Sequence, residues 1–445
     1  MTMTHNILLG CIADDFTGAT DLANNLVRGG MRVVQTIGVP SQPIGADVDA
    51  VVVALKTRTC APAQATSQSL AALAWLKSSG AQQIYFKYCS TFDSTASGNI
   101  GPVTDALMDA LGTDFTIACP AFPDNGRTIF KGYLFVGEEL LHESGMRHHP
   151  LTPMHDANLV RVLQAQTPRK VGLIDYKTVA AGSAAITARI AELKASGVAM
   201  AIVDATSNAE LIEAGKAWKG MPLITAGSGI AIGLPQNFAI QISQTSQASQ
   251  ADITKASPNA SQLPAPRGLQ AIVSGSCSVA TNGQVAHFIA QGGTAFCVDP
   301  MQWMIDADSS SDVTTQALAW AKAQFAAQAA SGKSAPILVY ATSTPEQVKA
   351  VQAKLGVEKS GELVERTLAT IAKGLVAMGV QQLVVAGGET SGACVQALDV
   401  TQLRIGPQIA PGVPWTHTGA LHLALKSGNF GSVDFFTEAF HQLAI

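Results

Sequence analysis

Residues 6–21, NILLGCIADDFTGATD, run from an apolar stretch into two adjacent carboxylates, Asp14 and Asp15. A turn of small residues follows, and the apolar residues Leu22 and Leu26 then stand at helical spacing. This order predicts a buried strand, a tight loop and the first turn of a helix. In an open α/β sheet, ligands bind just beyond the carboxyl ends of the strands. Because two carboxylates are costly to bury without partners, we expect one to cap the helix and the other to act on a ligand.

Apolar, β-branched runs alternate with longer amphipathic stretches through the first half of the chain. The predicted strands there are 33–37, 50–54, 84–88, 115–118, 171–174, 199–204 and 223–225, and the predicted helices are 62–78 and 100–111. Such alternation is typical of βαβ units and a mainly parallel sheet. Residues 120–153 interrupt it with a loop-rich insertion that holds a predicted hairpin at 128–136, and insertions of this kind are more often functional than decorative.

The composition changes at residues 241–267, where serine, glutamine, alanine and proline replace the large apolar residues. This segment cannot form a core and is predicted to be an interdomain linker. Beyond it the predicted strands are 271–274, 295–298, 337–340, 383–386, 403–405 and 422–425, and the predicted helices are 278–291, 314–330, 345–354, 363–378 and 434–443. We therefore expect an α/β protein of two domains, 1–240 and 268–445, each a mainly parallel sheet flanked by helices. The active site is expected in the cleft between them.

Composition excludes several classes of protein. A net charge of −4 leaves no basic surface for nucleic acid, and no apolar run reaches the length of a membrane span. The chain start lacks a basic segment and a cleavage site, which argues against a signal peptide. The seven cysteines are scattered without a CxxC pair, and the histidines near residue 148 lack metal-ligand spacing. We expect a cytoplasmic protein with reduced thiols and no metal held by its own residues, and homo-oligomerisation is left open.

Three turns of the second domain are rich in glycine and hydroxyl groups, and each follows a predicted strand. They are SGSCS at 274–278, GGETSG at 387–392 and SGNFG at 427–431. Glycines let a backbone come close to a phosphate, and the N–H groups at a helix start supply donors. The turns match neither a Walker A loop nor a GxGxxG fingerprint. Three of them nevertheless fit one nucleotide site better than three independent chain reversals.

The first domain has charged side chains at comparable strand ends. Arg58 follows one predicted strand, and Lys87 ends another that leads into Asp93. Together with the two aspartates of residues 6–21, they offer cations for an anionic substrate and carboxylates to accept a proton. Arg58 and Lys87 could instead form structural ion pairs with those aspartates, and Asp93 could be a turn residue or helix cap. A further turn, Gly227–Gly229, is interpreted as an ordinary helix entry, although it could border the cleft.

Six ordered motifs give the chain a resemblance to a known family. They are ADDFTGATD (13–21), KTR (56–58), KYCSTFDST (87–95), SGSCS (274–278), GGETSG (387–392) and LKSGNFG (425–431). In this combination the chain resembles the four-carbon acid sugar kinases over essentially its whole length. The resemblance implies an N-terminal sugar-acid-binding domain and a C-terminal nucleotide-binding domain. The runs 126–136 and 144–154 are similar to family members that act on 3-oxo-tetronates.

The resemblance implies an ATP-dependent kinase that phosphorylates the C4 hydroxyl of a four-carbon 3-oxo sugar acid, with Mg²⁺ bridging the phosphates. The ATP-binding residues would be Ser276, Gly388, Glu389, Thr390, Ser391, Gly428 and Gly431. The substrate-binding residues would be Arg58, Lys87, Ser94 and Thr95, with Arg58 or Lys87 on the substrate carboxylate. An aspartate would orient or deprotonate the attacking hydroxyl, and Asp15 is preferred over Asp14 and Asp93.

Two alternatives stay open at this point. Threonate or erythronate could be the substrate, because a keto group differs from a hydroxyl only in hydrogen bonds that one sequence cannot place in a pocket. A protein of another class, a two-lobed sugar-acid sensor without catalysis, would keep the cations of the first domain. It would not need three phosphate-type turns in the second domain. A nicotinamide oxidoreductase is disfavoured because the GxGxxG fingerprint is missing.

Overall fold

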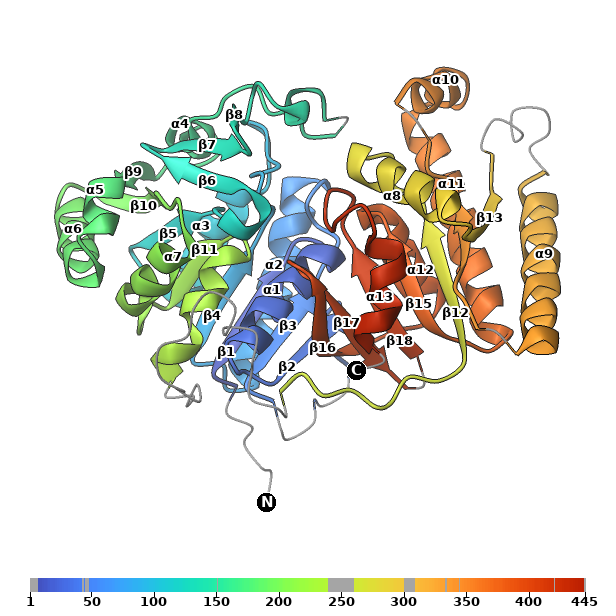
Figure 1. Cartoon of the computed structure of the whole chain (residues 1–445). Helices are drawn as coiled ribbons and strands as arrows, with labels where there is room; N and C mark the ends of the chain where they lie inside the picture. The colour runs from blue at the N-terminus through green and yellow to red at the C-terminus, as the bar shows by residue number, and fades with distance from the viewer. Residues whose placement is uncertain are drawn as a thin grey trace. The chain divides into compact units, whose positions relative to one another are not determined.

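The computed structural model describes residues 7–41, 44, 48–149, 151–238, 260–299, 309–332, 334–343, 345–419 and 421–443. The chain divides into two compact units, residues 1–261 and 262–445. Each unit contains a mainly parallel sheet with helices packed on it, which confirms the predicted α/β class (Figure 1). Much of the predicted linker, 241–267, lies outside the described residues. Within the described part, no helix is long and apolar enough to cross a membrane.

The sheet of the first unit contains eight parallel strands among the described residues. Their order across the sheet is β2-β3-β1-β4-β11-β5-β10-β9. The strands are β1 (Leu9–Ala13), β2 (Val33–Ile37), β3 (Ala50–Ala54), β4 (Gln83–Lys87), β5 (Thr116–Cys119), β9 (Lys170–Ile174), β10 (Val198–Val203) and β11 (Leu223–Ala226). The helices are α1 (Phe16–Arg28), α2 (Pro62–Ser78), α3 (Ile100–Leu111), α4 (Leu159–Gln164), α5 (Tyr176–Ala180), α6 (Ser183–Ala195) and α7 (Asn208–Gly215). The central strands β1 and β3 are buried along their whole length, as the apolar runs predict.

The connections of this sheet create a switch point between β1 and β4. The chain leaves β1 through α1 toward β2 on one side, and it leaves β4 through α3 toward β5 on the other. Because such crossovers are right-handed, α1 and α3 cover opposite faces of the sheet. The loops after β1 and β4 therefore diverge and leave a crevice at the carboxyl ends of the strands, where α/β proteins bind ligands.

The loop-rich insertion forms a small antiparallel sheet, which confirms the predicted hairpin. It consists of β6 (Arg127–Phe130), β7 (Tyr133–Val136) and β8 (Glu139–Leu140). Asp204, which follows β10 and is fully buried, accepts hydrogen bonds from the backbone N–H groups of Lys131 (2.7 Å) and Gly132 (2.8 Å). A carboxylate with backbone donors of this kind fixes the tip of the hairpin against the parallel sheet.

The second unit also has a parallel sheet, but an antiparallel strand pairs with one side of it. Its strand order is β13-β14-β12-β15-β18-β17-β16, in which the first five strands are parallel and β17 is antiparallel to both of its neighbours. The strands are β12 (Leu269–Ser274), β13 (Thr294–Cys297), β14 (Ile337–Tyr340), β15 (Val380–Ala386), β16 (Gln402–Ala410), β17 (Val413–Thr418) and β18 (Leu421–Lys426). The helices are α8 (Val279–Ala290), α9 (Ser309–Ser331), α10 (Pro345–Leu355), α11 (Val357–Ala377), α12 (Gly388–Ala397) and α13 (Phe435–Leu443).

This sheet also has a switch point, which lies between β12 and β15. The chain leaves β12 through α8 toward β13, and it leaves β15 through α12 in the opposite direction. The three glycine-rich turns follow β12, β15 and β18, which are neighbours in the sheet and end at the same edge. The crevice that the connections leave is therefore lined by all three turns.

Several elements differ from the sequence prediction. Strand β17 and the helices α4 to α7 were not predicted, and most other boundaries move by one to several residues. The antiparallel β16–β17 hairpin has mixed apolar and polar residues and a proline in each strand, Pro407 and Pro414, so its pattern resembles a loop. Helix α6 is largely exposed and alanine-rich, and α5 has only five residues, so neither shows the apolar stripe that marks a helix in a sequence.

The core of the second unit is built around Trp415, which is fully buried on β17. Its ring packs edge-on against Phe440 of α13, with 5.7 Å between centroids, and its indole Nε1 donates to the carbonyl of Ala439 at 2.7 Å. Helix α13 is thus held by an apolar contact and a buried hydrogen bond from the same side chain.

Replacing Trp415 with Phe should lower the free energy of unfolding by about 1–3 kcal/mol, because the buried Ala439 carbonyl loses its donor. Thermal or urea denaturation measures this loss. The matched control is Trp320→Phe, at a half-buried tryptophan that packs against Phe296, and it should cost clearly less. Equal losses for the two variants would contradict the importance of the Trp415 hydrogen bond.

Candidate functional site

In the first unit, the strand ends β1, β3 and β4 meet at the switch point. Ala13 is in register with Ala54 on one side and with Lys87 on the other. The backbone continues this pairing beyond the strands, because the Asp14 N–H donates to the Lys87 carbonyl and the Asp14 carbonyl accepts from Arg58. The charged residues that the sequence places at three separate strand ends are therefore brought together.

Arg58 forms a bidentate ion pair with Asp14. Its Nε lies 3.0 Å from Asp14 Oδ2 and its Nη2 lies 2.8 Å from Asp14 Oδ1. The same Nη2 also donates to Asp15 Oδ1 at 2.6 Å, and Nη1 lies 3.9 Å from Asp93 Oδ2. Of the two interpretations left open for Arg58, the structure contains the ion pair. Its Nε–Nη2 edge is occupied by Asp14, while Nη1 makes no hydrogen bond within the described residues.

Asp15 is the N-cap of α1. Its side chain accepts hydrogen bonds from the backbone N–H of Gly18 (3.0 Å) and the hydroxyl of Thr17 (2.7 Å). A side chain on residue 18 would approach the Asp15 carboxylate and would lie 2.9 Å from Lys87 Nζ, so only glycine fits there. Asp15 is therefore the capping aspartate of the pair, and it also contacts Arg58.

The two aspartates differ in exposure and in acidity. The Asp14 side chain is 8% exposed, whereas that of Asp15 is 21% exposed. Burial, together with the neighbouring Asp15 carboxylate, raises the pKa of Asp14 despite the Arg58 guanidinium. For Asp15, burial is outweighed by the charges of Arg58 and Lys87, so its pKa is lowered. Asp15 is thus the more stable anion and the more accessible of the two carboxylates.

Lys87 is buried beside these aspartates. Its Nζ donates to the carbonyl of the next residue, Tyr88, at 2.7 Å. Because Nζ lies close to the position that a Cβ on residue 18 would take, its charge sits next to the N-terminus of α1. Lys87 therefore lies in the charged cluster of Asp14, Asp15 and Arg58 as predicted from its strand end.

The remaining predicted residues of this domain lie in the loop after β4. Asp93 accepts from the Thr91 hydroxyl at 2.5 Å, and it is not a helix cap, since α3 has Asn99 as its N-cap. Ser94 is buried and accepts a hydrogen bond from Gln166 at 2.8 Å, whereas Thr95 is partly exposed.

The sequence analysis missed Asp21 as a functional candidate, and it interpreted the turn that contains Ser228 as a helix entry that could border the cleft. Asp21, in the middle of α1 and 3% exposed, accepts a hydrogen bond from the Ser228 hydroxyl. The Ser228 carbonyl in turn accepts from Asn25 at 2.9 Å. Asp21 Oδ1 has no hydrogen-bond partner among the described residues, and burial raises the pKa of this carboxyl to about 6. The turn after β11 therefore borders the charged cluster, and its glycine-flanked serine at a strand end was the available signal.

In the second unit, the three glycine-rich turns contact one another. The Ser278 hydroxyl lies 3.2 Å from Ser276 Oγ and donates to the Gly428 carbonyl at 2.5 Å. A side chain on residue 428 would meet Ser276 Oγ, and one on Gly387 would lie 3.1 Å from the backbone nitrogen of Ser276. The convergence that the sequence predicts is therefore present.

The N-terminus of α12 faces this convergence. Its N-cap is Gly387, at φ 121°, and no side chain caps the helix. Gly388 and Glu389 are exposed, whereas Thr390 and Ser391 are buried and turn their side chains into the unit. The first N–H groups of a helix have no acceptor within the helix, and they carry the positive end of its dipole. This helix start is therefore suited to bind an anion through its backbone.

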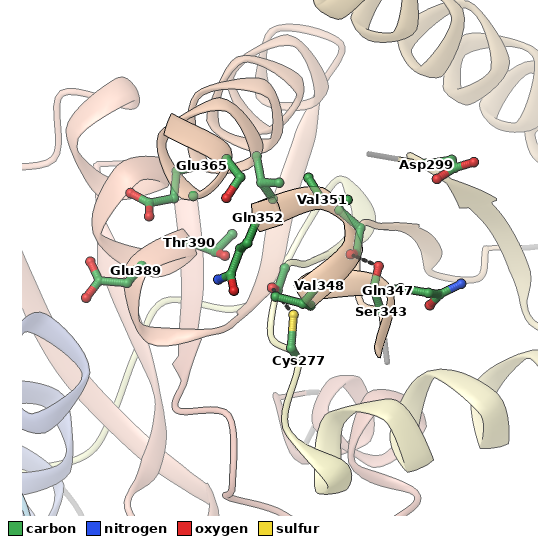
Figure 2. Close-up of a pocket in the computed structure, with 15 residues that line it drawn as sticks. Cys277, Asp299, Ser343, Gln347, Val348, Val351, Gln352, Glu365, Glu389 and Thr390 are labelled. Atoms are coloured by element: carbon green, nitrogen blue, oxygen red, sulfur yellow. Dashed lines mark hydrogen bonds between the residues drawn. The ribbon is translucent and has the colours of Figure 1, made fainter. Parts of the chain in front are cut away.

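A pocket of about 150 Å³ lies beside these turns, and Figure 2 shows the side chains that line it. One wall is apolar, with Val348 and Val351 of α10 and Val364 of α11, and Gln352 and Ser343 add polar groups. Glu389 and Thr390 of the α12 start complete the lining. The sequence analysis missed the contribution of α10 and α11, because their valines are indistinguishable from core residues in the sequence. Among the described residues, no cluster of His, Cys, Asp and Glu side chains could hold a metal ion.

Comparison with known proteins matches both halves of the chain. Residues 9–234 match a family model described as a sugar-binding N-terminal domain, and residues 271–436 match a nucleotide-binding C-terminal domain. The chain is similar to proteins named 3-oxo-tetronate kinase from Cupriavidus necator (57% identity, 99% of this chain and 98% of the other) and Burkholderia multivorans (58%, 98% and 97%). A solved structure from Haemophilus influenzae is 44% identical and covers 98% of this chain and 100% of the other, with a TM-score of 0.73.

The matches to the named kinases extend over nearly the full chain, with identity at more than half of its residues. The two matched domain types agree with the two clusters described above. The first unit gathers carboxylates and cations, and the second gathers glycine-rich turns. The chain belongs to the four-carbon acid sugar kinases, a family with a sugar-binding N-terminal domain and a nucleotide-binding C-terminal domain.

Proposed function

We propose that this protein is an ATP-dependent kinase that transfers a phosphoryl group to the C4 hydroxyl of a four-carbon 3-oxo sugar acid. The observation that supports it most is that the switch point of each unit gathers a different set of chemical groups. The first unit, within 1–240, gathers Asp14, Asp15, Arg58 and Lys87, and the second, within 268–445, gathers three phosphate-type turns. The names of the similar full-length proteins supply the substrate class.

On the acceptor side, Asp15 is the proposed partner of the attacking hydroxyl. It is the more exposed carboxylate of the pair, and its Oδ2 accepts only from Thr17 among the described residues. Phosphoryl transfer has a loose transition state, so an oriented proton acceptor matters more than a strong base. Asp14 would position Arg58, and the Nη1 of Arg58 would donate to the substrate carboxylate.

The other first-domain residues have supporting roles in this proposal. Lys87 would stabilise the anion at the N-terminus of α1, and the partly exposed Thr95 would contact the sugar acid. Asp93 would orient the Nη1 edge of Arg58 from 3.9 Å, and Ser94 would hold the loop through Gln166.

On the nucleotide side, the proposal assigns the phosphates to the backbone N–H groups at the start of α12 and of the turn at 427–431. Gly388, Glu389, Thr390 and Ser391 would act chiefly through their backbone, because the last two side chains are buried. The partly apolar pocket beside Thr390 would receive the base. Mg²⁺ would be held mainly by the phosphates themselves, as it usually is in kinases.

Two alternatives are weaker. Kinases of threonate or erythronate would use the same groups, but the full-length relatives carry the 3-oxo-tetronate name. A sugar-acid sensor without catalysis would leave the uncapped helix start and the converging turns without a use. Homo-oligomerisation and a cytoplasmic location stay predictions from the sequence.

The direct test measures ADP release from ATP in the presence of 3-oxo-tetronates, threonate and erythronate. ADP should form with a 3-oxo-tetronate much faster than with either hydroxy acid, and removal of Mg²⁺ with EDTA should abolish it. A folded protein that forms no ADP with any four-carbon acid would contradict the proposed function. Preference for a hydroxy acid would contradict only the substrate assignment.

Replacing Asp15 with Asn should lower kcat by about 10²-fold or more while the Kd for ATP changes less than about twofold. Asparagine caps helices as well as aspartate does, so α1 should persist. The matched control, Asp175→Asn, makes the same change at the N-cap of α5 and should leave kcat unchanged. If ATP affinity fell as much as turnover, Asp15 would belong to the nucleotide site.

Replacing Gly388 with Asp should weaken ATP binding at least about tenfold, equivalent to about 1.4 kcal/mol, because a carboxylate would stand among the phosphates. Acidic residues stabilise the first turn of a helix, so loss of folding should not be the cause. Thr401→Asp adds the same charge at the amino end of β16, the edge away from the turns, and serves as control. Calorimetry that gives equal ATP affinities for wild type and Gly388→Asp would remove residue 388 from the site.

A further inference from the structure

The side chain of Lys426, the last residue of β18, is completely buried under the turn at 427–431. Its Nζ is surrounded by four oxygen atoms. They are Thr281 Oγ1 at 3.0 Å and the carbonyl oxygens of Ser427 at 3.0 Å, Gly428 at 3.1 Å and Phe430 at 3.1 Å. An ammonium has only three N–H donors, so these oxygens use its full hydrogen-bonding capacity. Lys426 is therefore not available as a direct ligand of another molecule.

The carbonyl groups that point at Lys426 fix the direction of the amides that follow them. In a trans peptide unit the C=O and N–H bonds point in opposite directions, and the described chain has no cis peptide. The N–H groups of Gly428, Asn429 and Gly431 consequently point away from the ammonium. None of these three donates a hydrogen bond to any residue that the structure describes.

Other contacts hold the turn in this orientation. The Gly428 carbonyl also accepts from the hydroxyls of Ser278 (2.5 Å) and Thr281 (2.7 Å). Gln284 of α8 donates to the carbonyls of Phe430, Gly431 and Ser432 at 2.9–3.1 Å. Gly431 has φ 84°, and a side chain there would collide with the ring of Phe435. These donors fix the carbonyls of Gly428, Phe430 and Gly431, so the N–H groups that follow these carbonyls point away from the donors.

We propose that Lys426 is a positioning residue for the nucleotide phosphates: its ammonium draws the carbonyls of the 427–431 turn inward and so sets the outer N–H groups to bind a phosphate. A concave set of backbone N–H groups is an anion-binding arrangement. This inference rests on the proposed function, because it takes the anion to be the triphosphate of ATP.

The surroundings of Lys426 predict that ATP binding is coupled to protonation of its amino group. The groups that face Nζ come from α8 and the turn, and α13 adds the Phe435 ring at 5.9 Å. They are hydroxyl, carbonyl and phenyl groups, and no charged side chain of the described residues affects its pKa. Burial alone lowers the pKa of Lys426 to about 7. A bound triphosphate favours the charged form, so ATP binding above pH 7 should take up a proton, whereas below about pH 6 the lysine is already protonated.

The test is calorimetric titration of wild type and Lys426→Met with MgATP at pH 8, in two buffers of different ionisation enthalpy. Wild type should take up a proton on binding. Lys426→Met should bind MgATP at least about tenfold more weakly, with no proton uptake from this group. Binding of a 3-oxo-tetronate to the first domain should be unchanged in the variant, and thermal unfolding that matches wild type shows that the second domain, which contains residue 426, is folded. The control Lys373→Met removes an exposed lysine of α11 and should behave as wild type.

The outcomes separate the two proposals. If wild type binds no MgATP, the proposed function fails. If wild type binds it and Lys426→Met binds it within twofold as tightly, the positioning role is overturned. If Lys426→Met does not fold, Thr281→Val decides, since it removes one Nζ acceptor and one donor to Gly428. This variant should weaken MgATP binding about threefold or more, and unchanged affinity would overturn the role.

Discussion

Burial of charge at the carboxyl ends of the strands is the constraint on which both sites depend. A charged group removed from water is tolerated only when oxygen or nitrogen atoms of the protein replace the water. In the first unit, Arg58 satisfies this condition with the carboxylates of Asp14 and Asp15. In the second, Lys426 satisfies it with backbone carbonyls and one hydroxyl. Each of these two side chains thereby holds, through several hydrogen bonds, the loops that supply its oxygen partners.

The two units achieve this with the same strand arrangement. The order β2-β3-β1-β4-β11 of the first unit has its counterpart in β13-β14-β12-β15-β18 of the second, with the switch point at the same place. In each unit, the loops that follow three neighbouring strands lie at the carboxyl edge of the sheet, around the switch point. Topology thus determines where a ligand binds, and side chains determine which ligand. Carboxylates and cations lie at the ends of β1, β3 and β4, whereas glycines and hydroxyls follow β12, β15 and β18.

The sequence predicted much of this arrangement because strand ends carry short local signals. The buried runs, the paired aspartates and the glycine-rich turns were all identified, and two turns were correctly expected to precede α8 and α12. What could not be predicted depends on contacts between distant residues. Nothing near Asp21 in the sequence indicates Ser228, which lies more than two hundred residues away. The valines of α10 that line the pocket are likewise indistinguishable from core residues until the helix is placed.

The roles of Asp14 and Asp15 also could not be assigned from the sequence alone. The sequence predicts that one caps and one acts, but Asp15 caps α1 and is also the more exposed carboxylate. Capping and acting are compatible because a carboxylate offers about four acceptor positions, and the cap occupies only part of them. Asp14 is the residue with a purely internal partner, since both of its oxygens accept from Arg58.

The charge balance of the first-domain cluster sets a condition on substrate binding. Arg58, Lys87 and Arg127 face the carboxylates of Asp14, Asp15, Asp21 and Asp93, which gives three cations against four anions if all are ionised. An anionic sugar acid would add a fifth negative charge. One proton on a carboxylate makes the cluster neutral and removes this net repulsion, and burial raises the pKa of Asp14 and of Asp21. Asp21, whose Oδ1 has no hydrogen-bond partner among the described residues, is the carboxyl best placed to hold that proton. The aspartate that the sequence analysis missed would then neutralise the cluster, and Asp15, the proposed partner of the attacking hydroxyl, would stay ionised.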